Sequence, residues 1–96
     1  MAKYILLMNW TDQGIKTVKD SPNRLDAARA AAKGQGITLG DFYMTIGSYD
    51  MVVHVEAPDD AALAKWVLQV APGGAVRSTT LKAFGEDEYR KIVGSV

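Results

Sequence analysis

Four apolar stretches of strand length lie along the chain, and polar or glycine-containing segments separate them. Residues 3–10 (KYILLMNW) form a continuous apolar and aromatic run, which is typical of a strand buried on both faces. Residues 41–46 (DFYMTI) and 51–57 (MVVHVEA) lie on either side of a short polar break, and residues 75–84 (AVRSTTLKAF) form the last run. The pattern predicts four strands, of which the middle two form a hairpin.

The first gap between strands carries the signals of a helix. Residues 11–20 are predicted as a polar loop, and residues 21–36 (SPNRLDAARAAAKGQG) as the helix. Ser21 is the predicted N-cap and Pro22 takes the first helical position. The interior is rich in alanine, and Gly34 or Gly36 lies just past the end.

A second helix is predicted within residues 57–74, between the third and fourth strands. Asp59 or Asp60 caps its start, and it ends before a proline. Its apolar side chains recur at i, i+3, i+4 and i+7, at Leu63, Trp66, Val67 and Val70. Residues 86–93 predict a short closing helix with acidic residues in its first turn and basic residues in its last.

These elements follow the order βαββαβ, with one further short helix. Because crossovers are right-handed, the order predicts the ferredoxin-like α+β fold, with an antiparallel four-stranded sheet in the order 4-1-3-2. We expect residues 1–96 to form a single domain. Both crossover helices then cover one face of the sheet, and the other face meets water or a partner.

The polar break at residues 47–50 predicts how the hairpin strands pair. If Gly47 and Ser48 form a two-residue type II′ loop, the apolar pairs fall on the helix-covered face. These pairs are Ile46 with Tyr49, Met44 with Met51, and Phe42 with Val53. The open face then receives Thr45 with Asp50, Tyr43 with Val52, and Asp41 with His54, with Glu56 further along. The register therefore predicts Tyr49 in the core and Asp50 on the open face.

The first strand adds apolar area to the open face. Tyr4, Leu6, Met8 and Trp10 alternate with Ile5, Leu7 and Asn9, so either set leaves large apolar side chains beside Tyr43 and Val52. A monomer would expose an unusually large apolar patch. We therefore expect a homo-oligomer, a dimer or larger, that assembles through its sheet.

Composition and charge exclude several function classes. The 96 residues include 11 basic and 11 acidic ones, which give a formal net charge of zero, and no cysteine. This balance disfavours binding to nucleic acid or to a membrane surface, and acidic residues stand where an RNA-recognition domain displays basic and aromatic ones. Thiolate chemistry is excluded. No apolar run reaches the length of a membrane span, so we expect a cytoplasmic protein.

One cluster of ionisable residues is a candidate for catalysis. Asp41, Asp50, His54 and Glu56 all fall on the predicted open face. An aspartate beside the imidazole can set its tautomer and tune it as a general base near neutral pH. Alternatively, Asp41 and His54 form a satisfied polar pair inside an oligomer interface. We expect no metal and no cofactor, since Asp50 and His54 lie about 13 Å apart along a strand and a single histidine leaves too few ligands.

A second set of residues is a candidate for binding a small anionic or partly apolar metabolite. Arg77 precedes the three hydroxyl residues 78–80, a pattern suited to a carboxylate or a phosphate. Arg77 can instead form a structural ion pair, for example with Glu56. Trp10 ends the first strand and Tyr43 lies on the open face, so both join Arg77 and Glu56 as candidate ligand-binding residues.

Several motifs resemble those of the GYD domain family over nearly the full chain. They are NWTDQG (9–14), KDSPNR (19–24), GSYD (47–50), VEAPDD (55–60) and VRSTTLKAF (76–84) followed by EDEYRKIV. The Gly-Tyr-Asp signature corresponds to Gly47, Tyr49 and Asp50, with Ser48 between the first two. The resemblance implies a small bacterial or archaeal protein of ferredoxin-like fold, related in shape to the dimeric α/β barrels. It implies no particular reaction.

Two functions from different classes fit these residues. The first is a non-catalytic oligomeric module that binds a small metabolite or regulates a partner. The second is a cofactor-free enzyme of the dimeric α/β-barrel type, in which His54 acts as the base, Asp41 or Asp50 orients it, and Arg77 or Tyr43 binds an oxyanion. The enzyme requires an enclosed cavity, whereas the module does not.

Overall fold

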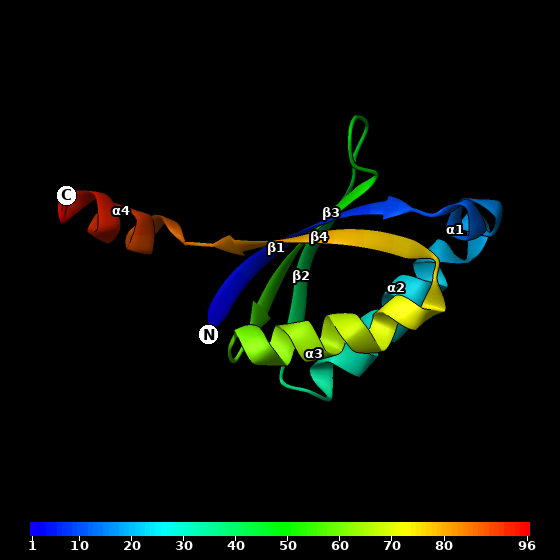
Figure 1. Cartoon of the computed structure of the whole chain (residues 1–96), viewed down its shortest axis with the longest axis horizontal. Coiled ribbons are helices and arrows are strands. Elements are labelled where there is room, and N and C mark those ends of the chain that lie inside the picture. The colour runs from blue at the N-terminus through cyan, green and yellow to red at the C-terminus, as the bar shows by residue number, and fades with distance from the viewer.

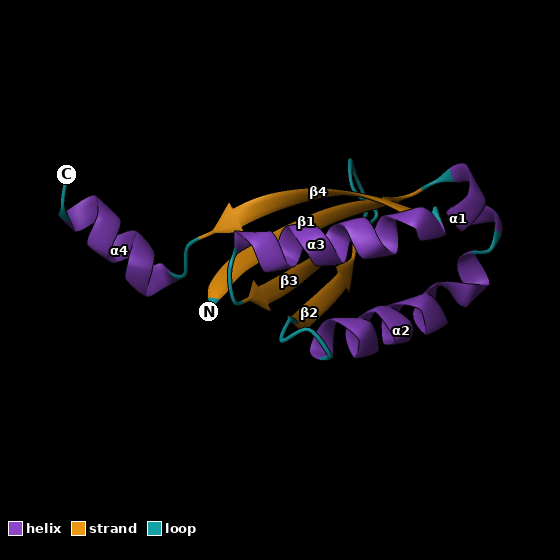
Figure 2. Cartoon of the chain, turned by 60° about the horizontal axis from the view of Figure 1, so that its bottom comes forward, coloured by secondary structure: helices purple, strands orange, loops and turns teal.

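Four antiparallel strands and two crossover helices form two layers in the computed structural model, which describes residues 1–96 (Figures 1 and 2). The strands are β1 (Ala2–Trp10), β2 (Thr38–Met44), β3 (Met51–Ala57) and β4 (Val76–Ala83), in the order β2-β3-β1-β4. Helices α2 (Ser21–Lys33) and α3 (Asp60–Val70) both lie on one face of the sheet. The predicted ferredoxin-like fold and strand order are confirmed.

The core lies between the sheet and the two helices. Alternate residues of β3 are buried, as expected for a strand with one face covered. Helix α2 contributes Ala32, whose small side chain is completely buried and lets the helix approach the sheet closely. The core cluster comprises Tyr4, Leu6, Ala32, Ile37, Val53, Val55, Ala57, Leu63 and Trp66.

The predicted pairing of β2 with β3 is confirmed from Phe42 to Thr45, whose amide donates to the Asp50 carbonyl at 2.8 Å, and it is wrong at Asp41. Phe42 pairs with Val53, Tyr43 with Val52, and Met44 with Met51. The register then shifts between Phe42 and Leu39, because Leu39 pairs with Val55. A three-residue step in β2 thus matches a two-residue step in β3, and this bulge keeps both apolar side chains on the core face. His54 consequently has no directly paired residue in β2, and the predicted Asp41–His54 pair does not form.

The loop of residues 45–50 is wider than the predicted two-residue turn. Gly47 has a φ of 137° near its tip, a backbone conformation that glycine adopts far more readily than other residues. The Thr45 hydroxyl donates to the Tyr49 carbonyl at 2.6 Å and closes the loop. Ile46 is fully exposed and Tyr49 lies outside the core cluster, so the predicted Ile46–Tyr49 core pair is wrong.

The segment between β1 and α2, predicted as a polar loop, contains a short helix, α1 (Asp12–Lys16), and a 3₁₀ turn (Val18–Asp20). The Thr11 hydroxyl caps α1 by accepting from the Gly14 amide at 3.1 Å. The Thr11 amide donates to the Ala75 carbonyl at 3.1 Å, and a Cβ at Gly14 would lie 1.9 Å from the same oxygen. Helix α1 is therefore held tightly against the chain that leads into β4.

The predicted helix caps have different outcomes. Ser21 is the first residue of α2 instead of its N-cap, and its hydroxyl accepts a hydrogen bond from Trp10 Nε1 at 3.2 Å. Ser21 already has helical dihedral angles, with φ −54° and ψ −43°, so it lies within the helix and not at its cap. The predicted cap of α3 is confirmed, because Asp59 accepts from the Ala62 amide at 2.8 Å. No helix in the chain is both long enough and apolar enough to traverse a membrane.

Helix α4 (Glu86–Gly94) agrees with the predicted closing helix in its bounds but projects away from the rest of the molecule (Figures 1 and 2). The chain therefore measures 48 × 31 × 18 Å. Its Cα radius of gyration is 14.4 Å, whereas a compact domain of this length has about 12.5 Å.

Candidate functional site

The sheet face opposite α2 and α3 is the candidate functional surface, and we call it the open face. Cross-strand pairing places Val52, Leu7 and Thr79 in one row, with His54, Ile5 and Leu81 in the next row. Charged and polar residues lie on either side of these two rows, toward the two ends of the strands. The open face comprises Lys3, Ile5, Leu7, Asn9, Tyr43, Val52, His54, Glu56, Arg77, Thr79 and Leu81.

The centre of the open face is apolar and partly exposed. Leu81 is 43% exposed and Tyr43 is 54% exposed, and Ile5, Leu7 and Val52 are half-buried between them. The charged residues of this face lie toward the ends of the strands, with Lys3 opposite Glu56 at one end and Arg77 opposite Asn9 at the other. This distribution is typical of a surface that another protein covers.

His54 lies on this face without a carboxylate partner. Its ring contacts the Tyr43 ring edge-on, with centroids 6.4 Å apart and an interplanar angle of 66°. No side chain forms a hydrogen bond with the imidazole, and Glu56 lies opposite Lys3 on β1. Asp41 is exposed in the bulged part of β2. Within one chain, the arrangement therefore lacks the residue that would orient His54 as a base.

Asp50 anchors the loop of residues 45–50 to the end of β1. Its carboxylate accepts from the Trp10 amide at 3.0 Å, and its own amide donates to the Met8 carbonyl at 2.9 Å and to Asn9 Oδ1 at 3.1 Å. In the Gly-Tyr-Asp signature, Gly47 thus shapes the loop tip, the Tyr49 carbonyl accepts the closing hydrogen bond, and Asp50 fixes the loop to the sheet.

The candidate ligand-binding residues do not converge within one chain. Arg77 is exposed opposite Asn9, and Glu56 pairs with Lys3 about 20 Å away along β1. The predicted Arg77–Glu56 ion pair is therefore wrong. The chain's two ion pairs join Lys82 to Asp60 and Arg90 to Glu86.

Trp10 is half-buried, and both of its N–H groups are already hydrogen-bonded, to Ser21 and to Asp50. Tyr43 is on β2, the strand at the far edge of the sheet from β4, which carries Arg77. No group of three or more His, Cys, Asp or Glu side chains is placed to hold a metal ion.

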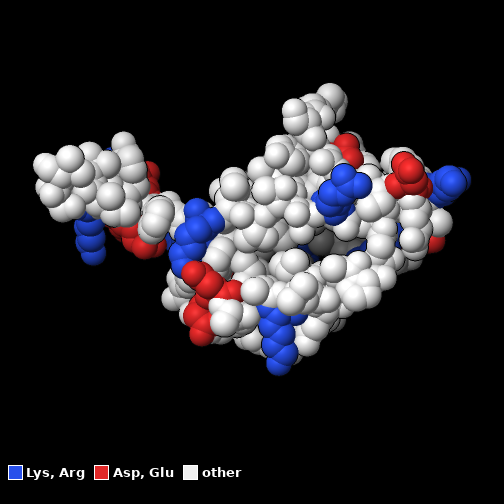
Figure 3. Space-filling model, viewed as in Figure 1, with Lys and Arg blue, Asp and Glu red and all other residues white.

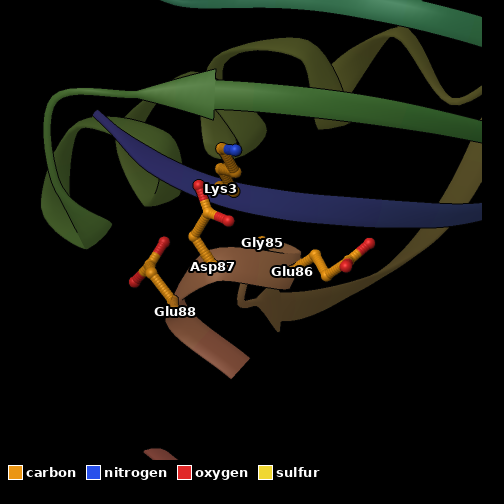
Figure 4. Close-up of a pocket in the computed structure, with 5 residues that line it drawn as sticks. All are labelled: Lys3, Gly85, Glu86, Asp87 and Glu88. Atoms are coloured by element: carbon orange, nitrogen blue, oxygen red, sulfur yellow. The ribbon is translucent and has the colours of Figure 1, made fainter. Parts of the chain in front are cut away.

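Two shallow hollows lie at the base of α4, away from His54. One is lined by Phe84, Glu86, Tyr89 and Ile92. The other is lined by Lys3, Gly85, Glu86, Asp87 and Glu88, and Figure 4 shows Glu86 and Glu88 pointing to opposite sides of the helix. Sequence reasoning assigned no role to these residues, although Tyr89, Ile92 and Val93 at i, i+3 and i+4 were a visible signal.

A polar cluster that sequence reasoning missed joins β1, α3 and β4. The Tyr4 hydroxyl donates to Asp60 Oδ1, Lys82 Nζ lies 2.6 Å from the same oxygen, and this ammonium lies 5.1 Å from the centre of the Tyr4 ring. The hydrogen bond to Asp60, followed by burial, raises the pKa of Tyr4. The hydrogen bonds from Lys82 and Tyr4 lower the pKa of Asp60, and the hydrogen bond to Asp60 raises the pKa of Lys82.

These features define a class: an α+β domain of ferredoxin-like fold. The chain is similar to the crystal structure of MtbAldR, with a TM-score of 0.68 and 17% identity over 88% of this chain and 54% of that one. It thus spans about half the length of that protein. It is also similar to FFRP-DM1, with a TM-score of 0.63 and 16% identity over 88% of this chain and 100% of that one. At these identities the likeness shows the fold alone.

The chain belongs to the GYD domain family, whose model matches residues 4–93. A relative from the bacterium Thermus thermophilus is 33% identical over 84 residues, which cover 86% of this chain and 88% of the relative. That relative is named a glutamine synthetase and cystathionine beta-lyase binding protein. The resemblance seen in the sequence motifs is therefore confirmed.

Proposed function

We propose that this GYD-domain protein is a homo-oligomeric module that assembles through its open face and binds a small metabolite or regulates a partner. The uncovered apolar centre of the open face carries this proposal. Ile5, Leu7, Val52 and Leu81 are neighbours across three strands and meet water on their outer side. Burying such a patch against its own copy removes apolar area from water at about 25 cal/mol per Å². A two-fold axis matches the patch with itself.

The total exposed area supports assembly. The 10.4 kDa chain exposes 6577 Å² to solvent. Compact monomers of this mass expose about 5,400 Å², so the excess is about 1,200 Å². A stable interface of standard size buries about 800 Å² on each partner. The chain therefore exposes enough additional surface to form one.

Binding explains the side chains of the open face better than catalysis does. Asp50 is engaged in anchoring the loop, and His54 contacts an aromatic ring instead of a carboxylate. Arg77 and Glu56 lie at opposite ends of the face, so they approach one ligand only if a second copy brings them together. The name of the Thermus relative supports a binding or regulatory role over an enzymatic one.

The substitution Leu81→Asp tests the proposal, because it places a charge in the centre of the apolar patch. We expect sedimentation analysis to show dissociation at concentrations where the wild-type chain is assembled, with a loss of affinity of about tenfold or more. Leu68→Asp is the matched control, since Leu68 is 73% exposed on α3, outside the open face. Equal assembly of both variants would contradict the proposal.

A further inference from the structure

One side of α4 carries an apolar stripe that its own chain leaves uncovered. Tyr89, Ile92 and Val93 follow the spacing i, i+3 and i+4, and each of them is between 47% and 58% exposed. Phe84, which is 57% exposed, precedes the N-cap and lines the same hollow as Tyr89 and Ile92. Figure 3 shows one side of α4 largely free of charged side chains. The helix is therefore amphipathic, but it has no surface to pack against.

A helix of this length needs such a surface. Helix α4 has nine residues, whereas isolated helices shorter than about 12–15 residues are marginal in water. Its own side-chain support consists of an exposed ion pair between Glu86 and Arg90 at 2.8 Å and a hydrogen bond from the Ser95 hydroxyl to the Ile92 carbonyl at 2.8 Å. Packing of the apolar stripe must therefore contribute most of the stability of the helix.

The connection to β4 keeps α4 away from the open face of its own chain. Only Phe84 and Gly85 separate the strand from the helix, and α4 extends beyond the end of the sheet (Figures 1 and 2). Gly85 packs against Lys3, since a Cβ at Gly85 would lie 3.0 Å from Lys3 Nζ. The helix thus leaves its own sheet at the end that carries Lys3.

We propose that α4 of each protomer docks on a second copy of this chain, at the end of the open face that carries Arg77. This inference rests on the proposed assembly through the open face. A two-fold axis perpendicular to the strands makes facing β1 strands antiparallel. The Lys3 end of one copy then lies over the Arg77 end of the other, and each α4 reaches its partner. Two unpartnered apolar surfaces of one chain, the stripe and the open face, thereby become covered in both copies.

Charge and shape at the receiving end match the helix. Arg77 has no ion pair, and the first turn of α4 carries Asp87 and Glu88, which also have none. Beside Arg77's end of the sheet, Ile46 is fully exposed on the loop of residues 45–50, which rises on the side away from α2 and α3 (Figures 1 and 2). In the proposed arrangement, the acidic first turn of α4 therefore faces Arg77 of the second copy. The apolar stripe of α4 faces the exposed Ile46 of that copy.

A cross-linking experiment tests the placement, because the natural chain has no cysteine. Mass-tagged Ile92→Cys is mixed with Ile46→Cys, the assemblies are allowed to exchange, and a short bismaleimide is added. We expect the mixed product to form efficiently, and to be rare when Leu68→Cys replaces Ile46→Cys. Equal yields with both partners, or links only between two copies of Ile92→Cys, would overturn the proposed docking.

A second measurement separates this inference from the proposed function. Ile92→Asp should weaken self-association by about tenfold or more, whereas Lys91→Asp on the polar side of α4 should change it by less than about threefold. If Ile92→Asp assembles like the wild-type chain while Leu81→Asp dissociates, assembly through the open face stands and docking of α4 is refuted. A wild-type chain that is monomeric at all concentrations refutes both.

Discussion

At the scale of single residues, the cluster of Tyr4, Asp60 and Lys82 makes stability depend on pH. Because the pKa of Asp60 is lowered on folding, its contribution is complete above the ordinary carboxylate pKa of about 4 and is lost as the pH falls through the lowered value. The pKa values of Tyr4 and Lys82 are raised. Their contribution is therefore complete below about pH 10 and is lost as the pH rises through the raised values.

Asp60→Asn should therefore lower the melting temperature most in the range between about pH 5 and 9. The amide keeps an oxygen that can accept the Tyr4 hydroxyl but loses the charge that attracts Lys82. Thermal unfolding across this range, compared with Asp26→Asn on the outer part of α2, measures the difference. A melting-temperature difference that persists undiminished below about pH 3 would rule out the ionic origin.

Asp50 offers a test of whether the family signature is structural. Asp50→Ala removes the acceptor of the Trp10 amide, and we expect a loss of about 1–3 kcal/mol in the free energy of unfolding. Asp50→Asn retains a side-chain oxygen and should lose less. Urea unfolding checks both values. Unchanged stability in Asp50→Ala would show that the anchor is dispensable and would return Asp50 to the list of functional candidates.

The sequence indicated which residues lie on the open face but not which of them form contacts. Alternation within the hairpin correctly placed His54 and Glu56 outward, since that depends only on the two-residue period of a strand. The contact between Tyr4 and Lys82 depends on how β1 aligns with β4, and the chain carries no local signal for that register. The same is true of Asp50, whose partners lie about 40 residues earlier in the chain.

At the scale of elements, the close approach of α1 to the start of β4 depends on one glycine. A Cβ at Gly14 would lie 1.9 Å from the Ala75 carbonyl oxygen, so Gly14→Ala must displace backbone. We expect a loss of about 1–3 kcal/mol or more in the free energy of unfolding, measured in urea. Gly73→Ala is the matched control, because nothing lies within 4 Å of its Cβ position. Equal stability of the two variants would contradict the close contact.

Element prediction succeeded where local patterns are strong and failed where distant partners decide. The apolar run of β1 and the capped stripe of α3 were found with nearly correct bounds. The Ser21 cap failed because the 3₁₀ turn of Val18–Asp20 leads directly into the helix and leaves Ser21 with helical dihedral angles. The bulge in β2 arises because Leu39 and Phe42 both reach the core. Helix α1 was missed since five residues with an interior glycine carry little helical signal.

At the scale of the whole molecule, the sequence predicted an uncovered sheet face but not the position of α4. The acidic first turn and basic last turn of α4 predict that a helix forms. They do not predict whether that helix packs on the rest of the chain or projects from it. The apolar stripe at Tyr89, Ile92 and Val93 indicated that some surface covers α4. We propose that this surface belongs to a second copy, and the sequence of one chain carries no signal for it.

The mass of the wild-type chain in solution tests the central claim most directly. Sedimentation equilibrium across a wide range of concentrations should give a multiple of the 10.4 kDa chain mass, most simply the dimer. A single species of 10.4 kDa at every concentration, including the highest, would contradict assembly through the open face.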